Sequence, residues 1–199
     1  KALLFLAAGS VIIGMHHDQD IRNMGGLRKY MPITWITFLL GTLALVGTPL
    51  FSGFYSKDDI IEAVHASDLP GSGFAYFAVA ASVFVTALYS FRVYFLVFHG
   101  PERFHHKPFP AEDDHDLGHG HAPHESPWVV TLPLVALAVP SVVLGFITIW
   151  GLLFSGFFDD AIIVDAARHP AMAELASHFH GAWAMALHGL SSLPFWLAL

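Results

Sequence analysis

Cysteine is absent from this sequence of 199 residues, which excludes disulfides, thiolate metal sites and cysteine nucleophiles. Charge is scarce as well, because 13% of the residues are charged, against about 25% in an average soluble domain. The formal net charge of -7 does not favour nucleic acid as a partner. The sequence contains no G-x-G-x-x-G, Walker, H-E-x-x-H or G-x-S-x-G motif, so we expect this chain to bind no nucleotide, flavin or iron–sulfur cluster.

Apolar residues are abundant: hydrophobic types make up 55% of the chain, and the mean hydropathy is +0.57. They gather in segments at about 1–15, 32–56, 73–98, 127–154 and 181–199. A helix of roughly 20 apolar residues crosses a bilayer, and helices satisfy their own backbone groups in lipid. The alternation typical of barrel strands is missing. We therefore expect an all-α, polytopic transmembrane helix bundle, cut from a longer protein because both ends lie within apolar runs.

The distribution of Lys and Arg predicts how the spans are oriented. Segments 16–31 and 99–126 would lie on one side of the membrane, and 57–72 and 155–180 on the other. The basic residues are Arg22, Arg28, Lys29, Arg103 and Lys107 on the first side, with Arg168 and at most Lys57 on the second. Because cytoplasmic loops carry the basic excess, we place 16–31 and 99–126 in the cytoplasm. Arg92 is then near the cytoplasmic end of its span, where we expect its side chain to reach the interface.

The segment 32–66 is longer than one span, and it is interrupted near its middle by Gly47, Thr48, Pro49, Ser52 and Gly53. In one interpretation, a single span ends at this cluster and Lys57 begins a loop. In the other, two half-helices flank an irregular stretch within 47–55, and Lys57 lies inside the membrane. Broken helices are tolerated in lipid only where protein or a water-filled cavity satisfies the backbone, which often marks an ion path.

Ionisable residues within apolar spans are candidates for function because they are costly there. Lys1 precedes thirteen uncharged, mostly apolar residues, and Lys57 follows the interruption. A lysine shielded from bulk water is suited to accept and release protons. Asp58 and Glu62 are near enough in the sequence to pair loosely with Lys57. His65 either continues such a relay or lies in an interfacial loop.

Segment 99–126 differs from the rest, since it holds seven histidines, four prolines and an acidic run. Closely spaced imidazoles such as His119, His121 and His124 suggest a metal site. The composition is equally that of a polar linker between two spans, and no framework fixes a coordination geometry. We therefore expect no metal site in this chain.

Two stretches carry a resemblance to a known family: KALLFLAAGSVIIGMHHDQDIRNMGGLRKYMP and, after it, GTPLFSGFYSKDDII. They are similar to the antiporter-like subunits of respiratory complex I, the family of the bacterial L subunit of NADH–quinone oxidoreductase and of mitochondrial subunit 5. The match is strong over residues 1–100. The first repeat of the family, a histidine upstream of Lys1 and a lateral helix expected after residue 199 are not in this sequence.

The resemblance implies an antiporter-like fold with two inverted repeats, each with a broken helix, of which this chain holds part of the second. Lys1 matches the central-axis lysine of that repeat. Lys57 matches the lysine of the broken helix, on the exit side, and Asp58 the acidic residue beside it. Residues 1–98 would then end the translocating module, 99–126 would form a His-rich cytoplasmic loop, and 127–199 would be C-terminal transmembrane helices at about 127–154 and 181–199.

The implied function is proton translocation in the bacterial inner membrane by a multi-pass subunit of an H⁺-translocating NADH:quinone oxidoreductase. Electron transfer from NADH to quinone, with its FMN and iron–sulfur clusters, would occur in other subunits, and the partners would be other membrane subunits and lipid. A multi-subunit Na⁺/H⁺ antiporter or a membrane-bound hydrogenase has the same fold and lysines, but the HDQDIRNMGGL loop favours complex I. A metal-handling membrane protein would explain the histidines and leave the interrupted helix unexplained.

Overall fold

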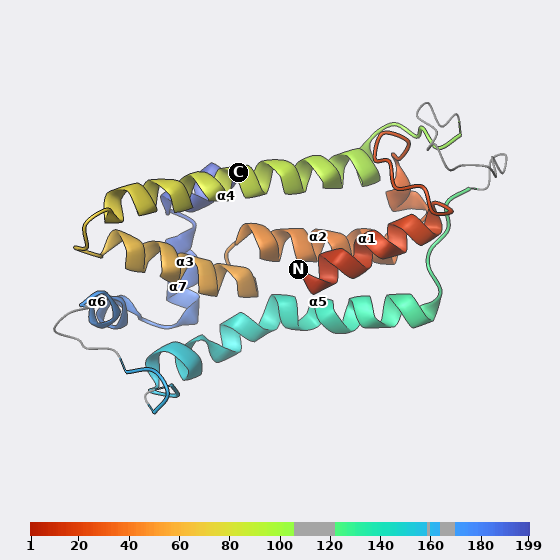
Figure 1. Ribbon diagram of the computed structural model, residues 1–199. Coiled ribbons are helices and arrows are strands. Elements are labelled where there is room, and N and C mark those ends of the chain that lie inside the picture. Colours follow the sequence, from red (N-terminus) through yellow and green to blue (C-terminus); the bar gives the residue numbers. More distant parts are fainter. Residues whose placement is uncertain (106–121, 159, 164–169) are drawn as a thin grey trace. The chain divides into compact units, whose positions relative to one another are not determined.

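The computed structural model describes residues 1–105, 122–158, 160–163 and 170–199, and all regular structure within them is helical (Figure 1). The helices are α1 (Ala2–Gly14), α2 (Pro32–Val46), α3 (Ser52–His65), α4 (Ser72–Tyr94), α5 (Trp128–Ile149), α6 (Ala171–His178), α7 (Ala182–Gly189) and α8 (Leu193–Ala198). A 3₁₀ turn, η1, covers Leu27–Lys29. Wider π-helical turns, η2 (Phe95–His99) and η3 (Trp150–Phe154), continue α4 and α5. The predicted all-α class with one broken helix is confirmed for these residues.

The chain divides into two compact units. The first is Lys1–Thr42 with Tyr89–Val139, and the second is Leu43–Leu88 with Pro140–Leu199. Most of the histidine-rich loop, residues 106–121, lies outside the described part of the chain. Its interpretation as a linker therefore stays a prediction.

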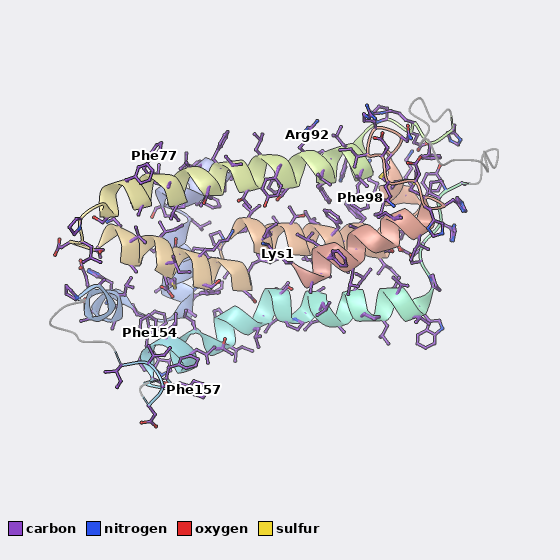
Figure 2. The ribbon with its side chains drawn as sticks, in the orientation of Figure 1. Lys1, Phe77, Arg92, Phe98, Phe154 and Phe157 are labelled. Carbon is purple, nitrogen blue, oxygen red and sulfur yellow. The ribbon has the colours of Figure 1, made fainter. Side chains whose placement is uncertain are left out.

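The first unit has an apolar core between α1, η2 and parts of α2 and α5. Its buried residues are Leu3, Ala7, Val11, Met15, Met24, Leu27, Phe38, Tyr94, Val97, Phe98, Phe104, Leu134 and Ala138. Phe98, which is fully buried, packs edge to face against Phe38 with 5.3 Å between the ring centroids (Figure 2). The hydroxyl of Ser10 lies 2.7 Å from the hydroxyls of both Thr34 and Ser126, so these buried polar groups satisfy one another.

The loop after α1 is held by its own polar side chains. The buried carboxylate of Asp18 accepts hydrogen bonds from the backbone N–H of Asp20 and from Nδ2 of Asn23, each with a donor–acceptor distance of 3.0 Å. Gly25 has a φ of 146°, and a Cβ added there would lie 2.8 Å from the carbonyl carbon of Pro101. Only glycine fits this backbone. The HDQDIRNMGGL motif is therefore an ordered turn.

The second unit has its core around α3. Phe54 and Tyr55 of α3 are buried together with Ile149 of α5 and Ala186 of α7. The Tyr55 hydroxyl donates a hydrogen bond of 3.2 Å to the carbonyl of Ala182, which connects α3 to the start of α7. These contacts position the part of α3 that carries the candidate residues.

Among the described residues, two stretches of helix are long and apolar enough to cross a membrane: Ser72–His99, which is α4 with η2, and Trp128–Phe154, which is α5 with η3. The apolar helices α1 and α2 are shorter. Phe77 points outward from α4 with 69% of its surface exposed (Figure 2), and Trp128 is 73% exposed. Apolar side chains exposed to this degree along a span belong against lipid or against another chain.

The structure differs from the sequence-based expectation at 181–199, where it has α7 and α8 instead of one span. Ser192 occupies the N-cap of α8, and its hydroxyl donates a hydrogen bond of 2.8 Å to the carbonyl of Gly189. Pro194 lies in the first turn of α8, where its missing N–H is not needed. The short helix α6 within 155–180 was likewise not predicted.

Candidate functional site

The break between α2 and α3 is built by a closing turn. Gly47, which follows the last residue of α2, has a φ of 88°. The N–H of Thr48 donates a hydrogen bond of 3.0 Å to the carbonyl of Leu43. This hydrogen bond is the six-to-one bond that ends many helices after a left-handed glycine. Leu50 then adopts a φ of 77°, which is strained for a branched side chain. Residues 47–51 therefore form a defined hinge, and the last carbonyls of α2 lack helical donors.

Lys57 uses one of these free carbonyls. It is half-buried in the second turn of α3, and its ammonium donates a hydrogen bond to the carbonyl oxygen of Leu45. Its aliphatic stem passes Gly47, where an added Cβ would lie 3.4 Å from Lys57 Cδ. A helix C-terminus carries about -0.5 elementary charge, which stabilises a neighbouring cation. The hinge thus offers Lys57 an acceptor in a region where lipid would offer none.

Glycine also brings α3 close to α2. A Cβ added at Gly53 would lie 2.8 Å from the carbonyl carbon of Ala44 and nearer still to its oxygen. Because both clashing atoms belong to the backbone, no side-chain rotation relieves the overlap. Gly53 therefore sets the distance across which Lys57 reaches Leu45.

Ser52, the first residue of α3, joins the hinge to α5. Its hydroxyl donates a hydrogen bond of 2.7 Å to the carbonyl of Pro140 and accepts one of 3.1 Å from the N–H of Gly145. A Cβ at Gly145 would lie 2.6 Å from Ser52 Cα and 2.9 Å from a ring carbon of Tyr55. The start of α3 is therefore fixed against α5 by two hydrogen bonds and by a close approach that only glycine permits.

Asp58 lies beside Lys57 in α3, and the structure brings the two residues to one small cavity. Both border a space of about 20 Å³, which is room for roughly one water molecule. Asp58 is 4% exposed, and its Oδ2 atom has no hydrogen-bond partner within the described residues. A buried carboxyl oxygen without a partner is unusual in a folded protein and marks a candidate for function.

The remaining candidates from the sequence do not border the space that Lys57 and Asp58 share. Lys1 precedes α1 in the first unit and is exposed, and its assignment as a proton-translocating residue stays a prediction (Figure 2). Arg92 is exposed on α4, in the first unit. His65 ends α3 and stacks edge to face on Tyr76, with 4.8 Å between the ring centroids.

Sequence reasoning missed two residues of this region. Asp59 is 9% exposed, and its Oδ2 atom lacks a hydrogen-bond partner among the described residues. His188 of α7 has its Nδ1 3.9 Å from Oε1 of Glu62. The doubled acid after Lys57 was a signal for Asp59. His188 is remote from α3 in the sequence, and no local pattern points to it.

The comparison with protein families agrees with the motifs. Residues 1–88 match the family described as NADH:quinone oxidoreductase/Mrp antiporter, transmembrane. The matched range includes α1, α2, the hinge and α3.

Individual relatives extend the likeness over the whole chain. It is 62% identical, over its full length, to NADH-quinone oxidoreductase subunit L of Neisseria meningitidis serogroup A, covering 30% of that protein. It is 46% identical over 85% of its length to NAD(P)H-quinone oxidoreductase chain 5 of Picosynechococcus, covering 27%. It is 40% identical over 74% of its length to NADH-ubiquinone oxidoreductase chain 5 of Marchantia polymorpha, covering 20%. The chain thus spans less than a third of the length of these relatives.

Proposed function

We propose that this chain, which resembles NADH–quinone oxidoreductase subunit L and its chain 5 counterparts, belongs to their antiporter-like family and moves protons across the bacterial inner membrane as part of such a complex. Electron transfer from NADH to quinone takes place in other subunits, so this chain contributes no redox chemistry and binds no cofactor. Its partners are the other membrane subunits and the surrounding lipid. Residues 1–98 form the end of the translocating module, 99–126 a cytoplasmic loop and 127–199 the C-terminal membrane part.

The observation that supports this proposal most strongly is the hydrogen bond from Lys57 across the hinge to Leu45. In its protonated form Lys57 is stabilised by the C-terminal end of α2. When that contact is weakened, the ammonium becomes a better proton donor to the neighbouring buried carboxyl of Asp58, through the space that both residues border. In the transfer an N–H bond of the Lys57 ammonium breaks and an O–H bond forms on the Asp58 carboxylate, so alternation between these two states moves one proton.

A Na⁺/H⁺ antiporter would use the same proton transfer by a lysine, and the family description includes Mrp antiporters. The relatives at 40–62% identity given above are all quinone oxidoreductase subunits by name. The ordered HDQDIRNMGGL turn is the feature of this chain that favours the same assignment.

The test is Lys57→Ala in the intact complex, reconstituted in vesicles, with proton uptake normalised to electron flux from NADH to quinone. We expect assembly to survive and the ratio of protons to electrons to fall sharply, because the chain loses its proton carrier. Lys57→Arg should lower the ratio as well, since a guanidinium does not release its proton near neutral pH. Arg92→Ala, which removes an exposed charge from α4, is the control. A wild-type ratio in Lys57→Ala would show that Lys57 takes no part in pumping.

A further inference from the structure

A cavity of about 640 Å³ lies in the second unit beside α3. From α3 it is lined by Asp58, Asp59, Glu62 and His65, and from α6 and α7 by Glu174, His178 and His188. His180, between α6 and α7, and Tyr76 of α4 are the other titratable groups in its wall. The other lining residues are mostly apolar, so these titratable side chains are the groups of the wall to which water or a proton would bind. The space far exceeds the ~15 Å³ that one water molecule needs.

The two buried carboxyls of α3 line this cavity. Asp58 is 4% exposed and Asp59 9% exposed, and the Oδ2 atom of each has no hydrogen-bond partner within the described part of the chain. A charged oxygen without a partner in a protein interior is costly, and water or a bound proton offsets that cost. The cavity supplies room for the water that these two oxygens lack.

Asp58 connects the cavity to Lys57. It borders the large cavity and also the space of about 20 Å³ that it shares with Lys57. A proton from the Lys57 ammonium therefore has a receiving carboxyl that faces both spaces. Asp59 follows in the chain, and Glu62 lies three residues after Asp59, on the same side of α3.

At the more exposed part of the wall, Glu62 of α3 lies close to His188 of α7. Oε1 of Glu62 is 3.9 Å from Nδ1 of His188, and the side chains are 40% and 72% exposed. The exposure of the carboxyl groups thus increases along α3, because Asp58 and Asp59 are buried and Glu62 is half-exposed. The count of Lys and Arg in the loops puts residues 57–72 on the side of the membrane opposite the cytoplasm.

We propose that Asp59 and the Glu62–His188 pair are further proton carriers, through which a proton that Lys57 gives to Asp58 leaves toward the non-cytoplasmic side. This inference rests on the proposed function. In each step one O–H or N–H bond breaks and one forms: the Lys57 ammonium becomes an amine as Asp58 becomes a carboxylic acid. Asp59 and Glu62 receive the proton in turn, through water in the cavity. His188 then takes it from Glu62 and releases it to water, and no oxidant or co-reactant is needed.

The experiment compares Asp59→Asn and Asp59→Glu in the intact complex, in vesicles, by the ratio of protons moved to electrons transferred. Asn keeps the size of Asp and cannot carry a proton, whereas Glu adds a methylene and can. We therefore expect Asp59→Asn to lower the ratio to near the Lys57→Ala value and Asp59→Glu to retain most of it. A packing role predicts the opposite order, because Asn fits the site and Glu overfills it, and that order would overturn the proposal.

Glu62→Gln and His188→Gln test the outer pair at a half-exposed and an exposed position, where substitution does not endanger folding. Each should lower the ratio, and the double variant should lower it no further than the more severe single variant if the two act as one unit. Asp68→Asn, an exposed carboxyl beyond the end of α3, is the matched control and should behave as wild type. If Lys57→Ala lowers the ratio while Asp59→Asn and Glu62→Gln both leave it unchanged, the exit route is wrong and the proposed function stands. If Lys57→Ala itself pumps normally, the proposed function fails.

Discussion

Gly53→Ala is the substitution for which the hinge predicts the largest structural effect. The new Cβ would lie 2.8 Å from the carbonyl carbon of Ala44, where carbon atoms prefer about 3.5 Å, so α2 and α3 must separate by at least about 0.7 Å. Overpacking by one methyl costs about 1–3 kcal/mol, and the absence of a movable side chain puts this site near 3 kcal/mol, roughly a hundredfold in an equilibrium constant. The same separation lengthens the hydrogen bond from Lys57 to Leu45.

The assay for Gly53→Ala is a heating series of the purified complex, with native gel electrophoresis to follow loss of the subunit, together with the ratio of protons to electrons in vesicles. We expect a lower midpoint temperature and a lower ratio. Gly9→Ala is the matched control, because no atom lies within 4 Å of its added Cβ and alanine favours a helix interior by roughly 0.5–1 kcal/mol. If Gly53→Ala matched Gly9→Ala in both measurements, the close approach of α2 and α3 would be refuted.

Two further predictions concern the first unit. Glu125 caps α2, since its carboxylate accepts the N–H groups of Ile33 (2.8 Å) and Thr34 (3.3 Å), so Glu125→Ala should destabilise the unit by about 1 kcal/mol, measured as a lower unfolding temperature in detergent. The hydrogen bond from Lys29, 3.1 Å long, holds the pKa of Glu102 below its usual 4.5. Its folded pKa is thus lower than its unfolded pKa, so this stabilisation is complete above about pH 4.5 and disappears as the pH falls through the folded pKa. Hydrogen exchange around η1 should rise below that pH in wild type and show no such step in Lys29→Met.

The sequence located the interruption between α2 and α3 because its causes are local, and the resemblance favoured two half-helices over a single span. Gly47 and Pro49 interrupt the apolar segment 32–56, and glycine and proline act on the backbone at their own positions. The helices of the apolar segments followed from composition for the same reason. The two helices at 181–199 were missed because the break depends on the hydrogen bond of one serine and on Pro194 in a first turn, in a stretch that is otherwise apolar.

The partners of the candidate residues were beyond local reasoning. The acceptor of Lys57 is a backbone carbonyl, which every residue has, so only the fold decides that it is Leu45. Glu62 meets His188 because α7 packs against α3, and neither the spacing nor the charge of the two segments shows this. The motifs identified Lys57 and Asp58 through a resemblance, while the cavity that connects Asp58 to Asp59 is a property of packing.

The hydrogen bonds of Ser52 to α5 limit the number of backbone torsion angles that are free to change at the hinge. Because α2 is closed at Thr48 by a backbone hydrogen bond and α3 is fixed to α5 at Ser52, any movement of the Lys57 backbone relative to Leu45 has to come from residues 47–51. Five residues have ten soft backbone torsions, and the ring of Pro49 removes one of them, which leaves about nine. One of these is the φ of Leu50, held at 77° in a strained region, so rotation there releases conformational energy. So few degrees of freedom restrict the lysine to a small number of backbone states, and a two-position carrier requires that restriction.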